Sequence, residues 1–415
     1  MSSLSSFRLQ NTRRKLRKLV SAVKEARHCT KKATIERERL CKELNAGKLP
    51  ELEANSVKVQ EMYDAGAFGV VFSGIFRGGR VAIKVARAPQ RGGALLKEGV
   101  LTARVGEGEG EMWVPQVYGV VFIPWGKLPW GKAGGIAEER ERGEICSALV
   151  MEWVEGVALE KFFGRGAGSS EVALEVARQL FHFLHYLATL NIVHCDLQTK
   201  NVFVCPATAP GKGIQVKVID FGEAVEADVE AGRKGHPSFQ TPEMLARGMP
   251  ISCPSDTFAV GLLLWWMLTR LPLWQEVVRR LEAERRREVG DENFALTLPQ
   301  QHHAIAFEEL RPPLDLLPQN DAALPPSSVD ALRQVLRSCW KEEADRRVAP
   351  KDAAEKLAAL QGSTPEDLEE ALNSFIRSLS SREFSSEGSW DDDTGRSSEV
   401  AEQRGDDEDD SEFSW

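Results

Sequence analysis

The residues most able to do chemistry lie in the stretch His194-Cys195-Asp196-Leu197-Gln198-Thr199-Lys200-Asn201 and in Asp220-Phe221-Gly222 shortly after it. Phosphoryl transfer needs little covalent work from a protein, which must supply a carboxylate facing the acceptor hydroxyl and oxygen ligands for Mg²⁺. Asp196 is the candidate for that carboxylate. Asn201 and Asp220 offer the neutral and anionic oxygens that a hard cation prefers. The pattern therefore indicates Mg²⁺-dependent phosphoryl transfer.

The stretch resembles the catalytic loop HRDLxxxN of eukaryotic protein kinases, and Asp220-Phe221-Gly222 is similar to their metal-binding triplet. The resemblance covers roughly residues 57–361. It implies an α+β fold of two lobes, a small, mainly antiparallel β lobe and a large, mainly α-helical lobe. It also implies ATP and Mg²⁺ as cofactors and proteins as substrates, with Asp196 as the base and Asn201 and Asp220 as metal ligands.

Three further motifs are most similar to the tyrosine-kinase-like group, which includes Raf- and mixed-lineage-like kinases. They are Met-Glu-Trp-Val-Glu-Gly at 151–156, Asn-Val-Phe-Val at 201–204 and the CWxxxxxxR pattern from Cys339 to Arg347. Membership of this group favours serine or threonine as the acceptor. The resemblance also predicts that Arg347 neutralises Glu243 and that Asp256 braces the backbone of the catalytic loop.

A glycine-containing hairpin before Lys84 predicts the phosphate-binding part of the nucleotide site, because backbone N–H groups there can approach phosphates closely. Glu98, on an expected helix from Ala94 to Val105, is the predicted partner of Lys84. The resemblance places adenine at the backbone of 152–154, with one bulky residue behind it and one aromatic ring beneath it. The expected nucleotide-site residues are Gly66, Ala67, Phe68, Gly69, Val71, Ala82, Lys84, Glu98, Met151, Glu152, Val154 and Phe203.

Several positions depart from the family pattern and keep a second interpretation open, a pseudokinase that binds nucleotide or partners without transfer. Asp64 replaces the first glycine of the loop, and Gln198 and His236 replace a lysine and a threonine typical of Ser/Thr kinases. In Ser/Thr kinases that lysine touches the γ-phosphate of ATP, and Lys200 is the alternative cation that could reach it. Because Lys84, Asp196, Asn201 and Asp220 are all present, catalytic activity is the favoured reading.

Periodicity predicts helices at 172–190 and 276–288, strands at 114–122 and 148–154, and a last amphipathic helix beginning at Thr364-Pro365. The expected domains are a basic helical or coiled-coil-like extension at 1–55 and a kinase domain at 56–361, divided near residue 155. A C-terminal helix at 362–380 and an acidic, disordered tail at 381–415 follow. The tandem Pro-Trp-Gly-Lys at 124–132 is expected either to cover the small lobe or to anchor a partner protein, as the N-terminal helix also could.

Charge and cysteine content bear on partners and compartment. Residues 1–50 hold 14 Lys/Arg against 4 Asp/Glu, whereas residues 381–415 hold 3 against 13. Seven cysteines without Cys-x-x-Cys spacing favour a reducing compartment. We expect a cytoplasmic protein with no transmembrane segment and no nucleic-acid partner. The alternative is an organelle, because residues 1–24 are basic and free of acids, as transit peptides are.

Overall fold

The computed structural model describes residues 49–65, 69–86, 92–129, 145–166, 168–208, 213–227, 234–246, 250–319, 321, 324–360 and 362–383. Three predictions lie outside these residues: the helix within 1–48, the glycine-loop residues Gly66, Ala67 and Phe68, and the acidic tail beyond Glu383. Trp130, in the second Pro-Trp-Gly-Lys, also lies outside them.

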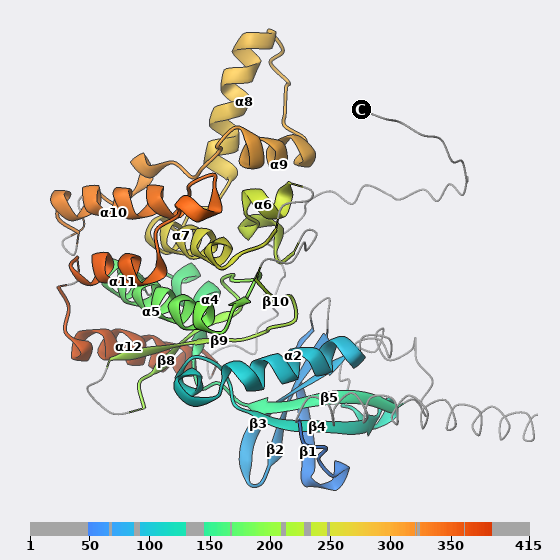
Figure 1. The fold of residues 1–415 in the computed structure, drawn as a ribbon. Coiled ribbons are helices and arrows are strands. Elements are labelled where there is room, and N and C mark those ends of the chain that lie inside the picture. The colour runs from blue at the N-terminus through green and yellow to red at the C-terminus, as the bar shows by residue number, and fades with distance from the viewer. Residues whose placement is uncertain are drawn as a thin grey trace, which may run out of the picture. The chain divides into compact units, whose positions relative to one another are not determined.

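The first part of the described chain is a five-stranded antiparallel sheet with the order β1-β2-β3-β5-β4. Val, Ile and Phe dominate these strands, as is usual for pleated, half-buried segments. Figure 1 shows helix α2 lying across the sheet. The elements are β1 (Val57–Ala65), β2 (Gly69–Phe76), β3 (Gly79–Ala86), α2 (Gly92–Val105), β4 (Val117–Pro124) and β5 (Ile145–Glu152).

The sheet separates two apolar clusters because successive side chains point to opposite faces. Along β4, Val120 and Phe122 join the cluster that includes α2, whereas Val121 and Ile123 join the cluster on the other face. Trp125, in the turn after β4, is 2% exposed and belongs to that second cluster. Its burial fits the expectation that the Pro-Trp-Gly-Lys loop covers this lobe.

The second part is mainly helical and is organised around α7, whose side chains are buried on nearly every side. A helix that is apolar all round must lie in the middle of a core, and α5 and α10 pack against it. The helices are α4 (Leu159–Gly164), α5 (Ser170–Thr189), α6 (Pro242–Leu245), α7 (Cys253–Thr269), α8 (Gln275–Val289), α9 (Leu298–Phe307), α10 (Pro326–Cys339), α11 (Pro350–Ala358) and α12 (Pro365–Glu383).

Five short strands carry the loops of the site. One small sheet has the order β6-β8-β9, and β7 pairs with β10 in another. Figure 1 shows β8 and β9 between the helices and the five-stranded sheet. The strands are β6 (Val157–Ala158), β7 (Ile192–Val193), β8 (Val202–Pro206), β9 (Ile214–Val218) and β10 (Val225–Glu226).

Helix α8 projects away from the other helices in Figure 1 and buries none of its side chains. Its side chains form ion pairs and also hydrogen bonds with the backbone, since Arg286 Nε donates to the carbonyl of Phe294 and Glu282 accepts the N–H of Leu296. Arg280 pairs with Glu276 on the same helix and with Asp315 beyond it, and Arg286 pairs with Glu282. The predicted charged helix at 276–288 is therefore present, and ion pairs contribute more to its attachment than apolar burial does.

The predicted α+β fold is confirmed, and the bounds of two strands need correction. The strand expected at 114–122 runs from Val117 to Pro124, and the buried Val114 lies before it. The strand expected at 148–154 runs from Ile145 to Glu152, so Val154 lies in the connection to β6.

The chain divides into two compact units at Phe375, within α12. Thr364 caps this helix, as predicted: its Oγ1 accepts a hydrogen bond from the N–H of Asp367, and its N–H donates to the Asp367 carboxylate. Phe375, in the first unit, packs edge-on against Phe162 at 5.1 Å. Among the described residues, no helix is long and apolar enough to cross a membrane.

Candidate active site

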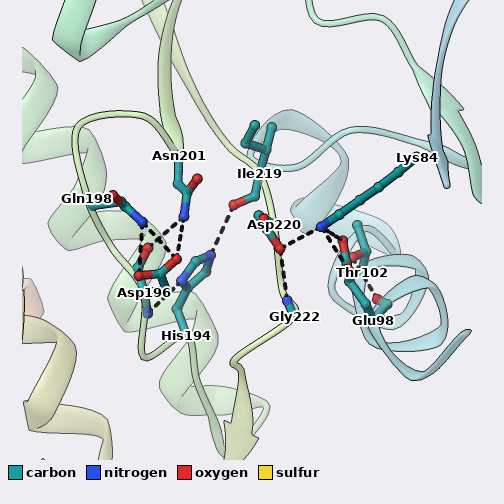
Figure 2. A network of polar contacts seen from close by, with 10 residues as sticks. All are labelled: Lys84, Glu98, Thr102, His194, Asp196, Gln198, Asn201, Ile219, Asp220 and Gly222. Carbon is teal, nitrogen blue, oxygen red and sulfur yellow. Dashed lines mark hydrogen bonds and ion pairs between the residues drawn. The ribbon is translucent and has the colours of Figure 1, made fainter. Parts of the chain in front are cut away.

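Lys84 of β3 lies between two carboxylates from different elements. Its Nζ donates to both oxygens of Glu98 at 2.8 and 2.9 Å and to Oδ1 of Asp220 at 2.8 Å (Figure 2). Burial opposes the positive charge of Lys84, but Glu98 and Asp220 outweigh it and raise the pKa of the ammonium above its ordinary value. Lys84 is therefore a fixed cation that joins the sheet, α2 and the segment after β9.

The register of the sheet places other expected nucleotide-site residues beside Lys84. Val71 is directly opposite Lys84, and Ala82, two residues before Lys84, is opposite Met151. Residues opposite each other share a face of a sheet, as do residues two apart. Val71, Ala82 and Met151 are only half-buried. This face is thus lined by apolar side chains that the core does not fully cover.

The remaining expected adenine contacts are Glu152 at the end of β5, Val154 in the connection after it and Phe203 of β8. Glu152 and Val154 are half-buried, as is Phe203 on β8. The side chain of Glu152 is engaged by Lys217 of β9 at 2.7 Å. Its backbone N–H donates to the carbonyl of Gln116. The guanidinium of Arg80 lies 3.8 Å over the ring of Trp153.

The carboxylate of Asp196 is held by four hydrogen bonds. Gln198 Nε2 donates to Oδ1 at 3.1 Å and to Oδ2 at 2.9 Å, Asn201 Nδ2 donates to Oδ2 at 2.8 Å, and the N–H of His236 donates to Oδ1 at 2.7 Å. Burial raises the pKa of Asp196, and these donors pull it down in part. Sequence reasoning treated Gln198 only as a lost lysine and missed this contact. The signal for this contact was the spacing of two residues between Asp196 and Gln198, which brings the side-chain amide within reach of the carboxylate.

The backbone of the catalytic loop is fixed from below by Asp256 of α7. Oδ2 of Asp256 accepts the N–H of His194 at 2.6 Å, and Oδ1 accepts the N–H of Cys195 at 3.0 Å. The predicted bracing contact is therefore present. Cys195 has φ 65°, a backbone conformation that residues other than glycine rarely adopt. The two hydrogen bonds to Asp256 help to hold the backbone in this conformation.

His194 links the catalytic loop to the segment that carries Asp220. Its Nδ1 accepts the N–H of Asp196 at 3.3 Å, so the ring proton lies on Nε2, which donates to the carbonyl of Ile219 at 3.3 Å (Figure 2). The ring also meets Phe221 edge-on at 4.7 Å. Burial lowers the pKa of His194 to about 4, so the ring is neutral at pH 7.

Cys195, next to Asp196 in the sequence, lies in an apolar cluster with Val193, Ala227, Met244 and Ile251. Burial raises the pKa of its thiol far above the ordinary range. Because the thiolate is the reactive form, this environment supports the packing interpretation of Cys195 over a redox role.

Residues 234–240 rest directly on the catalytic loop. Gly235 has φ 69°, and a Cβ at that position would lie 2.1 Å from the carbonyl oxygen of Cys195. Only glycine permits this approach, which brings the N–H of His236 to Asp196. His236 thus contacts the carboxylate through its backbone, although its side chain replaces the expected threonine.

The residues present fit ATP and Mg²⁺. Because Asn201 turns its Nδ2 toward Asp196, its amide oxygen faces away from that carboxylate (Figure 2). Asp220 uses Oδ1 for Lys84 and the N–H of Gly222. Burial opposes its charge, but Lys84 keeps its pKa below the ordinary value. An amide oxygen and a carboxylate are suitable ligands for Mg²⁺, which would offset phosphate charge when bound.

The remaining expected site residues are Lys200 and the glycine loop. Lys200 is exposed and makes no ion pair within the part of the chain that the structure describes. Gly66, Ala67 and Phe68 lie outside the described residues, whereas Gly69 begins β2. The catalytic, metal and nucleotide roles assigned from the sequence stay predictions.

The buried pair Glu243–Arg347, predicted from the sequence, lies below the catalytic loop. Arg347 donates to both carboxylate oxygens of Glu243, at 2.7 Å each, and both side chains are almost fully buried. Arg347 also donates to the carbonyls of Lys341 and Pro254. Burial opposes the charge of Glu243, but Arg347 holds its pKa below the ordinary value.

With this geometry in place, sequence comparison identifies the family. The family described as "Protein kinase domain" matches residues 139–357, more than half of the 415 residues. The chain therefore belongs to the protein kinase family.

The similar curated proteins are also kinases. Mitogen-activated protein kinase kinase kinase zak-1 of Caenorhabditis elegans is 24% identical over 331 residues, covering 75% of this chain and 35% of the relative. Human mitogen-activated protein kinase kinase kinase 10 is 27% identical over 240 residues, 55% of this chain and 22% of the relative. Calcium/calmodulin-dependent protein kinase type II of C. elegans is 35% identical over 141 residues, 33% of this chain and 19% of the relative. The chain thus spans between 19% and 35% of the length of these relatives.

Proposed function

We propose that this protein is an active kinase that transfers the γ-phosphoryl group of MgATP to serine or threonine hydroxyls of protein substrates. The observation that carries the proposal is the joined network of Lys84, Glu98 and Asp220 beside an Asp196 carboxylate held by Asn201. In such a site Lys84 binds the phosphates, Asn201 and Asp220 hold Mg²⁺, and Asp196 orients the acceptor hydroxyl and takes its proton.

Serine and threonine are proposed as acceptors because of the similarity to mitogen-activated protein kinase kinase kinases. The motifs at 151–156 and 339–347 support the same tyrosine-kinase-like group. We also propose a cytoplasmic location, supported by seven cysteines without Cys-x-x-Cys spacing and by the free thiols of Cys195, Cys205 and Cys339.

A pseudokinase is the second candidate, and one observation favours it. The four hydrogen bonds to Asp196, from three donor groups, occupy the lone pairs that would accept a substrate hydroxyl, and no lysine stands at position 198. In the active protein, Gln198 must therefore rotate away when the acceptor binds. The two candidates differ in whether this rotation occurs.

A transfer assay separates the candidates. Purified protein is incubated with Mg²⁺, γ-labelled ATP and a generic protein acceptor, and the labelled amino acids are identified after hydrolysis. Label on serine and threonine that is lost with Asp196→Asn supports the proposal. Nucleotide binding with no label above that variant would support the pseudokinase.

Asp64→Gly is expected to lower the Michaelis constant for ATP by about twofold. Asp64 is exposed and replaces the first glycine of the loop, so its charge repels phosphate, although exposed charges interact by about 1 kcal/mol or less. Its Oδ1 also accepts the N–H of Ala65 at 2.8 Å. Asp64→Asn is the matched control, because it removes the charge and keeps an acceptor for that N–H. A lower Michaelis constant in both variants supports the charge effect, whereas an increase in the glycine variant alone would assign Asp64 to capping the loop.

Phosphatase treatment is expected to leave the activity of the purified protein unchanged. In kinases switched on by phosphorylation of this segment, the new phosphate pairs with an arginine before the catalytic aspartate. Here that position is the buried Cys195, and the segment from Glu223 to Pro237 contains no hydroxyl. Lys234 instead pairs with Glu223 at 3.2 Å, and Gln240 Nε2 donates to the carbonyl of Lys234.

The measurement is transfer rate before and after phosphatase, with phosphosites mapped by mass spectrometry. Ser238→Ala and Thr241→Ala are the informative variants, because these hydroxyls lie immediately after the segment. A large loss of activity traced to either residue contradicts the prediction.

A further inference from the structure

The residues just before the sheet form a short strap along β4. The carbonyl of Pro50 accepts the N–H of Val120 at 2.9 Å, and the N–H of Leu52 donates to the carbonyl of Val120 at 2.7 Å. Glu51 forms a parallel bridge with Val120. Residues 49–52, which we call the strap, thus extend the edge of the sheet next to α2.

Leu49, the first residue of the strap, is buried between α2 and the sheet. It is 7% exposed and belongs to the cluster of Leu95 and Leu96 of α2 with Val120 and Leu149 of the sheet. The absence of a side chain at Gly99 makes this possible, because a Cβ there would lie 2.5 Å from Leu149 Cδ1 and 3.0 Å from Leu49 Cδ1. A glycine in a helix interior weakens the helix. Here the packing of Leu49 and Leu149 into the space beside Gly99 offsets that loss.

Leu49 lies against Gly99, which is next in the sequence to Glu98, the residue that holds Lys84. Glu98 directly precedes Gly99 on α2, is buried, and makes both hydrogen bonds to Lys84. A shift of α2 into space vacated by Leu49 would carry Glu98 with it. Because Lys84 is buried among carboxylates, it depends on this pairing for its position.

We infer that Leu49 is a positioning residue for phosphoryl transfer, which holds α2 so that Glu98 fixes Lys84. The inference deepens the proposed function and rests on it. The observation behind it is that the side chain of Leu49, from the strap, occupies the space beside Gly99.

Leu52 provides a matched control within the same strap. It is half-buried and packs against the cluster on the opposite face of the sheet, away from α2. A Cβ on Gly119 would lie 3.0 Å from Leu52 Cγ, so Leu52 is closely packed as well. Leu52→Ala therefore removes the same atoms from the same strap without opening space beside α2.

The experiment compares Leu49→Ala, Leu49→Met and Leu52→Ala in the full chain. Leu49→Ala is expected to lower kcat about tenfold, which corresponds to about 1.4 kcal/mol in the barrier, with a much smaller change in the Michaelis constant for the protein acceptor. Leu49→Met, which conserves volume, and Leu52→Ala are expected to stay within about twofold of the original protein. A tenfold loss with Leu52→Ala as well would overturn the inference, since general weakening of the sheet would then explain both.

A second test asks whether Leu49 acts through Glu98. In a Glu98→Gln background, adding Leu49→Ala is expected to change kcat by less than about twofold, because the pairing it supports is already lost. A further tenfold loss in that background would show that Leu49 acts by another route.

Hydrogen exchange gives a readout independent of activity. Leu49→Ala is expected to speed amide exchange in α2 at least about fivefold while α5, in the helical part, keeps its original rate. Equal acceleration of both helices would mean general destabilisation and would overturn the inference. If the original protein transfers no phosphate at all, the proposed function fails, and this comparison of α2 with α5 still decides whether the strap holds α2.

Discussion

Asp196→Asn is expected to lower kcat for phosphoryl transfer on the order of 10²- to 10⁴-fold, the contribution of a positioned general base. The asparagine keeps the shape of the side chain but cannot accept the proton of the hydroxyl. Its amide would meet donors from Asn201 and His236 where the carboxylate accepted them. Gln198 can turn its amide and offer an oxygen instead, so the loop is expected to stay folded.

The matched variant is Asp220→Asn, which is expected to impair Mg²⁺-dependent nucleotide binding, the step before transfer. Asp220 supplies the anionic oxygen proposed for Mg²⁺ and one of the two carboxylates on Lys84. Nucleotide affinity should therefore lose its dependence on Mg²⁺ in Asp220→Asn and keep it in Asp196→Asn. Titration of ATP with and without Mg²⁺, together with single-turnover transfer rates, separates the two effects. Full transfer activity in Asp196→Asn would show that another group is the base.

Arg347→Met is expected to lower the free energy of unfolding by about 3–5 kcal/mol, because it leaves the buried carboxylate of Glu243 without its partner. The guanidinium is fully buried and also serves the carbonyls of Lys341 and Pro254. Urea unfolding followed by tryptophan fluorescence measures the loss. Arg346→Met, at an exposed neighbouring arginine paired with the exposed Glu343, is the control and should change little.

The double variant Arg347→Met with Glu243→Leu sharpens this prediction. Replacing both members of a buried pair with apolar groups is often nearly neutral, so the double variant should recover much of the stability lost in the single one. A double variant as unstable as the sum of both single variants would contradict this account. Because pairing lowers the pKa of Glu243 below its ordinary value of 4.5, the stabilisation is present above about that pH. It is lost as the pH falls through the lower pKa of the folded state.

The parts of the site that the sequence predicted best are those fixed by short motifs or by composition. Glu98 is the only acidic residue between Ala94 and Val105, so composition alone selected the partner of Lys84. Asp256 and Arg347 were found because their partners lie in motifs at fixed places along the chain. For Asp256 and Arg347, the resemblance to the kinase family supplied the prediction.

Contacts that depend on packing or on backbone geometry were not predictable in the same way. The orientation of Gln198 toward Asp196 depends on the turn of the loop, and the approach of Gly235 depends on a positive φ. The contact between Leu49 and α2 joins residues far apart in sequence with no polar group to mark them. Helix α9 did leave a signal, since Thr297, the residue before the helix, and Gln300, its third residue, form a capping box.

Helix α8 has a consequence for how this sequence can change over generations. Since none of its side chains is fully buried and polar contacts such as the ion pair Arg280–Asp315 tie it to its surroundings, the core constrains its composition less than that of α7. Substitutions in α8 would leave the positions of Asp196 and Lys84 untouched and escape the selection that holds the catalytic loop constant. Lineages of this protein should therefore diverge first in α8, where new surface chemistry can be acquired without loss of the fold.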